Sequence, residues 1–180
     1  MTDTYHALVG RLTALAVLWN SLYSDSKAIA VAIVFAHVGG LLVAGGFALA
    51  ADRSTYRAWR APAGERARHL AELGAVHRPV VAGLAVVNLS GVLLFLADVK
   101  TYAASVAFGI KLLLVALLLV NGLVMTRAEA ALRPPTGVAA AGLSAVGQAE
   151  GAWRRLRVAA VVSALLWLAT TFVGVVLSNG

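Results

Sequence analysis

The sequence contains no cysteine, and this absence excludes several kinds of chemistry. Disulfide bonds, iron-sulfur clusters, thiolate ligation of zinc or copper, and thiol nucleophiles all require the cysteine sulfur. Any metal or redox function of this chain must therefore use other side chains.

Charged residues are also scarce, because they make up 13% of the 180 residues while 61% are hydrophobic. Soluble domains carry about 25% charged residues, and disordered chains carry more charge and less hydrophobicity than that. The composition excludes a soluble enzyme and a disordered chain. The net charge of +7 suggests nucleic acid only if the basic residues share one soluble face, and here they fall between long apolar segments. We expect no nucleic-acid partner.

Long apolar segments dominate what is present. A membrane-spanning helix needs about 20 mostly apolar residues, and a lipid environment forces such segments to be helical. The sequence therefore predicts a single all-α integral membrane domain over residues 1–180, a four-helix transmembrane bundle whose partner is the lipid bilayer. The four predicted spans are residues 28–51, 79–97, 102–125 and 158–177.

Basic residues in the loops predict the orientation of the bundle. Three basic residues, Arg11, Lys27 and Lys100, lie on one side, and eleven arginines lie in the two loops of the other side. Cytoplasmic loops carry the excess of Lys and Arg, so we expect both termini outside the cytoplasm in a bacterial inner membrane. The eleven are Arg53, Arg57, Arg60, Arg66, Arg68, Arg78, Arg127, Arg133, Arg154, Arg155 and Arg157.

The first 26 residues and the loop after the first span have their own patterns. Leucines recur at three- and four-residue spacing from Leu8 to Leu22, which predicts an amphipathic helix on the outer surface. The alternative is a fifth span, which would move the N-terminus to the cytoplasm. Residues 24–26 should form the turn and cap into the first span. In the following loop, Pro62 and Gly64 predict a break before a short charged helix over 65–73.

Three polar residues lie inside the apolar spans, where polar side chains are expensive and usually functional. His37, Asn88 and Lys111 each come nine positions after the first residue of their predicted span. At a rise of about 1.5 Å per residue that is about 14 Å of depth, near the middle of a core about 30 Å thick. The first and third spans run in the same direction, so His37 and Lys111 can belong to one site.

Lys111 has no Asp or Glu at its depth to pair with. A buried ammonium group without a counter-ion costs several kcal/mol. Two explanations remain open: a bound anion in the middle of the membrane, or an aliphatic stem that carries the ammonium group toward the outer interface.

His37 also has two interpretations. It is either a neutral imidazole bonded to a neighbouring helix or a ligand of a metal or heme. Ala36, Gly40 and Ala44 form a ridge of small residues beside it, which predicts either close helix packing or a slot for a flat macrocycle. His77 lies about half a membrane away, so it is not a second axial ligand of the same heme, although it can serve a second site near the inner face.

The remaining polar residues of the spans have a simpler interpretation. Asn88 is a candidate cofactor-binding residue, but it also suits an interhelical hydrogen bond. We expect the same packing and hydrogen-bonding role for Gly91, Ser163, Thr170, Thr171 and Gly174.

Three segments together resemble the copper-resistance D-like (CopD-like) membrane family. They are the first span, with His37, its glycines and Arg53 just beyond, the run FGIKLLLV at residues 108–115, and the arginines at 154, 155 and 157. The histidine and the intramembrane lysine are also similar to those of the small bacterial heme-associated membrane protoporphyrinogen oxidases. The similarity covers most of residues 28–177. The chain departs from the oxidases in lacking an aromatic-rich first helix.

The resemblance implies that His37 matches the heme-associated histidine and Lys111 the essential lysine of the oxidase group. We therefore expect a heme-b-binding or porphyrin-handling membrane protein in which His37, Lys111 and Asn88 contact the cofactor and His37 ligates the metal. The alternatives are CopD-like copper handling and an accessory subunit without cofactor. Copper handling is weakened because only Met1 and Met125 offer thioether ligands. These three functions leave open whether the chain forms a homo-oligomer or has an electron-transfer partner.

Overall fold

The computed structural model describes residues 2–133 and 143–179, and this part of the chain contains helices and no strands. Four of its helices are long and apolar enough to cross a membrane. They are α2 (Lys27–Ala58), α3 (Ala63–Ala97), α5 (Val106–Leu132) and α6 (Leu143–Asn179). The predicted all-α membrane bundle of four spanning helices is confirmed. Many large apolar side chains on these helices are exposed, as lipid-facing residues must be.

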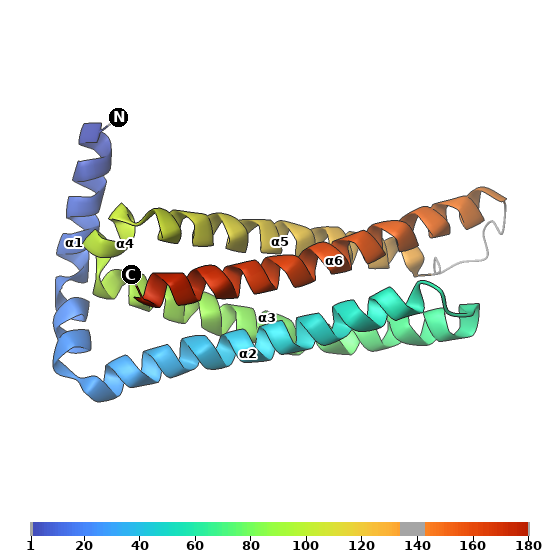
Figure 1. The fold of residues 1–180 in the computed structure, drawn as a ribbon, viewed down its shortest axis with the longest axis horizontal. Coiled ribbons are helices and arrows are strands. Elements are labelled where there is room, and N and C mark those ends of the chain that lie inside the picture. The colour runs from blue at the N-terminus through green and yellow to red at the C-terminus, as the bar shows by residue number, and fades with distance from the viewer. Residues whose placement is uncertain (1, 134–142, 180) are drawn as a thin grey trace.

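Helix α1 (Thr2–Asp25) is separate from the four spans and lies across one end of the bundle (Figure 1). The indole nitrogen of Trp19 donates to the Leu93 carbonyl at 2.7 Å, and the Asn20 amide donates to the Ala97 carbonyl. Both bonds fasten α1 to the end of α3. Leu18 and Leu22 of the predicted leucine stripe are exposed. The predicted cap is also confirmed, because α1 ends at Asp25 and the Ser26 side chain accepts from the Ile29 amide.

The four spanning helices form two closely packed pairs. Helix α2 packs along α3, α5 packs along α6, and contact between α2 and α6 joins the pairs. Helices α3 and α5 do not approach each other closely along their length. The N-terminus, the short helix α4 (Val99–Ala104) and the C-terminal end of α6 lie at one end of the bundle, which we call the α1 end (Figure 1).

Small residues account for the close approach of α2 and α3. Gly40 and Ala44 of the predicted ridge meet Gly83, where an added Cβ would lie 2.8 Å from the Ala44 amide nitrogen and 2.9 Å from the Gly40 carbonyl oxygen. Ala44 is fully buried. At Gly40 and Ala44 the ridge therefore serves close packing of α2 against α3.

Two predicted boundaries are wrong. The separate helix expected over 65–73 is instead the first part of α3, which runs without interruption through Pro79. The second span had been predicted to begin at Pro79, but a proline in a membrane helix is tolerated because neighbouring groups can satisfy the freed carbonyl, and α3 continues on both sides of it. The third span begins at Val106 and not near 102, because Ser105 has extended backbone and caps α5 by accepting from the Phe108 amide.

The opposite end of the bundle holds the turn between α2 and α3, the end of α5 and the start of α6 (Figure 1), and we call it the arginine-rich end because most of the eleven arginines lie on the helix segments next to it. Its apolar core includes Leu73, Trp153 and the fully buried Leu156. The guanidinium of Arg66 lies 5.4 Å from the centre of the Trp153 ring, and that of Arg157 lies 4.8 Å from the Trp59 ring. These cation–π contacts hold part of the basic charge against the helices.

Candidate functional site

Two cavities lie where α3 and α5 face each other, with α2 and α6 behind them. One cavity is lined by His37 and lies nearer the α1 end, and we call it the His37 cavity. The other is lined by Asp52 and lies nearer the arginine-rich end, and we call it the Asp52 cavity. Leu84, Leu118 and Trp167 line both cavities and pack together between them. Gly45 makes room for this indole, because an added Cβ there would lie 3.3 Å from the Trp167 ring. The polar groups of the two cavities are thus separated by an apolar layer.

The His37 cavity has a volume of about 300 Å³ and brings together the three residues singled out from the sequence. His37 comes from α2, Asn88 from α3 and Lys111 from α5. Trp167 of α6, nine positions after the first residue of the predicted fourth span, also lines it. The aromatic rings of Phe95, Tyr102 and Phe108 lie at its α1 end, where the two phenylalanine rings are stacked with centroids 5.2 Å apart.

The orientation of His37 is fixed by Ser90 on the neighbouring helix. The imidazole Nδ1 lies 3.0 Å from Ser90 Oγ, and this hydroxyl also lies 2.6 Å from the Val86 carbonyl oxygen. A carbonyl can only accept, so the single hydroxyl proton of Ser90 points at Val86. Nδ1 must then be the protonated donor, and Nε2 keeps the free lone pair. An imidazole held in this tautomer is ready to bind a metal through Nε2.

Two glycines leave space for the basic side chains of the cavity. A Cβ added to Gly91 would lie 3.3 Å from His37 Cε1, and a Cβ added to Gly174 would lie 3.4 Å from Lys111 Nζ. The Lys111 side chain therefore reaches across to α6 at Gly174. Within the described residues its ammonium group has no ion-pair partner.

Other polar groups complete the lining. Thr170 is 4% exposed, and its hydroxyl oxygen has no hydrogen-bond partner in the part of the chain that the structure describes. Asn88 donates to the Leu84 carbonyl of its own helix at 2.8 Å, so the predicted interhelical bond of Asn88 is not formed. Burial raises the pKa of the Tyr102 phenol on α4.

The electrostatics of the His37 cavity favour an anion. Among the residues that the structure describes, its lining contains one lysine, one histidine and several neutral polar groups, and no Asp or Glu. A buried ammonium group without a carboxylate is stabilised by a negatively charged ligand. The apolar and aromatic remainder of the lining suits a ligand whose body is hydrophobic and whose charge is confined to one edge.

The burial and contacts of several polar residues were not predicted from the sequence. Asn121 on α5 donates to the Ala159 carbonyl on α6 at 2.9 Å, which is the interhelical bond that had been expected of Asn88. Asp52 and Glu129 lie just past the ends of the predicted first and third spans, where acidic residues look like ordinary loop residues. The structure buries both of them in the Asp52 cavity.

The fold and its polar interior define a multi-pass integral membrane protein with a helical bundle of four spans. No protein-family model, curated protein or solved structure matches the chain.

Proposed function

We propose that this membrane protein binds a hydrophobic anion in the His37 cavity, and that heme b or a related porphyrin is the ligand. One observation carries the proposal: His37, with its Nδ1 committed to Ser90, lines the same cavity as Lys111, which has no carboxylate nearby. The combination offers a metal ligand and a cation in an apolar space at the middle of the bundle.

The side chains present fit the chemistry of heme b. His37 Nε2 is the nitrogen that would bind iron, and Lys111 would pair with a propionate. The unpartnered Thr170 hydroxyl supplies a further donor for a carboxylate. The cavity volume of about 300 Å³ lies at the lower end of the range for ligand sites, so the fit rests on the chemistry of these groups.

Bound heme would supply one-electron redox chemistry, whose potential depends on the axial ligand and on burial. The chain contributes positioning: Ser90 holds the imidazole tautomer, Gly91 and Gly174 leave room for the two basic side chains, and the apolar lining excludes water. Heme or porphyrin handling is also what the resemblance of the sequence to the CopD-like family and to the heme-associated oxidases would imply. We also propose that the protein lies in a bacterial inner membrane with its arginine-rich end in the cytoplasm.

No specific observation favours the copper alternative. Within residues 2–133 and 143–179, no three His, Cys, Asp or Glu side chains gather where they could hold a metal ion. An accessory subunit without cofactor would leave the unpaired Lys111 and the unpartnered Thr170 without a role.

The visible spectrum of the detergent-purified protein, before and after addition of hemin and dithionite, tests the proposal. We expect a Soret band that shifts on reduction in the wild type, and its loss or a strong shift in His37→Ala. His77→Ala is the matched control, because His77 lines the other cavity and its loss should leave the spectrum unchanged. A protein that stays colourless and takes up no hemin, or equal spectra in wild type and His37→Ala, would refute the proposal.

A further inference from the structure

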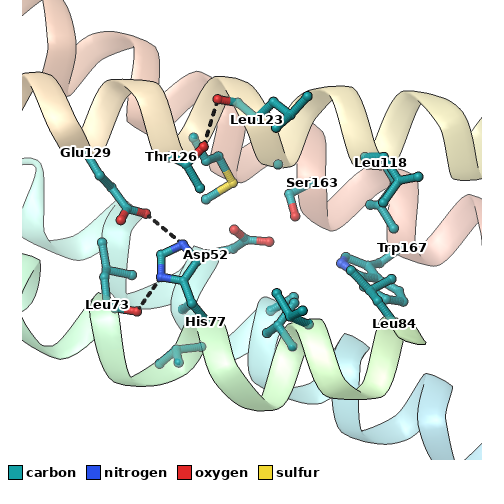
Figure 2. A pocket seen from close by; sticks show the side chains of 18 residues that line it. Asp52, Leu73, His77, Leu84, Leu118, Leu123, Thr126, Glu129, Ser163 and Trp167 are labelled. Atoms are coloured by element: carbon teal, nitrogen blue, oxygen red, sulfur yellow. Dashed lines mark hydrogen bonds and ion pairs between the residues drawn. The ribbon is translucent and has the colours of Figure 1, made fainter. Parts of the chain in front are cut away.

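The Asp52 cavity has a volume of about 260 Å³ and contains charged groups of both signs in an otherwise apolar lining. Asp52 from α2, His77 from α3 and Glu129 from α5 point into it, and Ser163 from α6 faces them (Figure 2). This set lies apart from the His37 cavity, beyond the apolar layer of Leu84, Leu118 and Trp167.

His77 and Glu129 compensate each other. His77 Nδ1 lies 2.9 Å from the Leu73 carbonyl oxygen and must donate to it, since a carbonyl only accepts. Nε2 is thereby directed at Glu129, whose Oε1 lies 3.7 Å away. The imidazole and the carboxyl group lie within ion-pair distance, so each is a polar partner of the other in this cavity. Arg133 also acts on Glu129 electrostatically, so this carboxyl group has two basic neighbours.

Asp52 is less well compensated, because the Ser163 hydroxyl bonds its carboxyl group and brings no charge. It is 5% exposed, and its Oδ2 has no hydrogen-bond partner among the described residues. In the described part of the chain, no lysine, arginine or further histidine lines this cavity besides His77, which is engaged with Leu73 and Glu129. An acceptor buried without a donor destabilises the folded protein, and more so when it is charged. The unpartnered Oδ2 of Asp52 and the cavity beside it together indicate that a ligand with a hydrogen-bond donor binds there.

We propose that the Asp52 cavity binds a monovalent organic cation, a protonated amine with a compact apolar body. The ammonium group donates to Asp52 Oδ2, and the body lies among Val80, Leu84 and Leu118. The Trp167 indole closes the far end of the cavity and offers an aromatic surface to the ligand. The cation restores neutrality on Asp52 and leaves the His77–Glu129 pair intact.

The competing occupants fit less well. A proton alone would neutralise Asp52 but leaves a cavity of about 260 Å³ with apolar walls unexplained. A multivalent metal ion needs several oxygen or nitrogen ligands at one point, and no such group of three is found in the described part of the chain. A neutral apolar ligand fills the volume but provides no donor for Asp52.

A matched pair of probes tests the proposal on the full-length protein in lipid nanodiscs. The probes are 1-adamantanamine, which is protonated at neutral pH, and 1-adamantanol, which has nearly the same shape and no charge. Binding is measured by the change in tryptophan fluorescence and by calorimetry. We expect the amine to bind about 10- to 100-fold more tightly than the alcohol, the ratio that a charge-assisted hydrogen bond provides.

Three variants make the test specific. Asp52→Asn keeps the shape but should reduce the ratio of amine to alcohol affinity to about one, whereas Lys111→Met, in the other cavity, should leave the ratio unchanged. Trp167→Phe should remove most of the fluorescence response while calorimetry still detects binding. Acidification that protonates Asp52 should weaken wild-type binding of the amine and not of the alcohol, which serves as the test if Asp52→Asn fails to fold.

Equal affinities for the two probes in the wild type, or an unchanged preference in Asp52→Asn, would overturn the proposal. Proton uptake by Asp52 without amine binding would show that the site holds a proton only, and it would also overturn the proposal. Neither result bears on heme binding, because the spectrum of the His37 cavity is read independently in the same samples.

Discussion

His37 on α2 donates through its imidazole Nδ1 to Ser90 on α3, with 3.0 Å between the two atoms. Ser90 Oγ can accept this hydrogen bond because the hydroxyl donates its own proton to the Val86 carbonyl oxygen, 2.6 Å away. The pair therefore does two things. It bonds two spanning helices together in the apolar interior, and it leaves Nε2 as the ring nitrogen with a free lone pair.

Ser90→Ala should weaken heme retention while the bundle stays folded. Partners that orient a ligating histidine typically change metal affinity by about 10- to 100-fold when removed. Hemin titration of the purified variant, followed at the Soret band, measures this change. Ser163→Ala is the control, because it removes a buried serine hydroxyl from the other cavity and should leave hemin affinity unchanged. Equal losses in the two variants would show a general packing effect.

Lys111→Met should reduce the retention of an anionic ligand without reducing membrane insertion. Methionine approximates the length of the lysine stem, and removal of an intramembrane charge makes insertion easier. The ratio of heme to protein after purification measures retention, and the amount of protein in the membrane fraction measures insertion. Lys111→Arg keeps the charge and should retain more ligand than Lys111→Met. If the two variants retain the same amount as the wild type, Lys111 does not contact the ligand.

Gly83→Ala should destabilise the bundle. The added Cβ would lie 2.8 Å from the Ala44 amide nitrogen and 2.9 Å from the Gly40 carbonyl oxygen, so two helix backbones must separate. Such overpacking costs about 1–3 kcal/mol. Unfolding in SDS, followed by circular dichroism, measures the change in the free energy of unfolding. Gly46→Ala is the control, because no atom lies within 4 Å of its added Cβ, and it should leave stability unchanged or slightly higher.

Single cysteines should report the orientation of the bundle, since the natural chain has none to interfere. A cysteine at Ala63, in the arginine-rich end, should be protected from impermeant thiol reagents in intact cells, and one at Asn179 should be labelled. The excess of arginine at one end is the reason. Labelling in the opposite sense would overturn the proposed orientation. Labelling of Thr2→Cys and Asn179→Cys on opposite sides would mean that α1 crosses the membrane.

Much of the fold could be predicted because the membrane limits the choices. An apolar segment of about 20 residues in lipid must be helical, so the four spans followed from composition alone. Boundaries were harder. Pro79 looked like the start of a helix but lies inside α3, and the extended Ser105 that separates α4 from α5 gave no strong sequence signal. Both depend on neighbouring helices that the local sequence does not reveal.

The candidate site was only partly predictable for a similar reason. Depth along parallel helices placed His37 and Lys111 in one layer, and the structure puts both on one cavity. Depth along a helix does not tell in which direction around the helix axis a side chain points. The Ser90 partner of His37 and the unpartnered Thr170 were therefore not predicted. Asp52 and Glu129 were missed because they follow the apolar runs and are buried only by the packing of other helices.

Imidazole rescue of His37→Gly tests the central claim, that His37 ligates heme b, most directly. The variant leaves space beside Gly91 where the ring had been, so free imidazole can replace the lost side chain. The measurement is the reduced and oxidised visible spectrum of hemin-treated protein with and without added imidazole. We predict that the wild-type spectrum is lost in the variant and restored by imidazole but not by pyrrole, which lacks a basic nitrogen. A variant that keeps the wild-type spectrum without imidazole would contradict the claim.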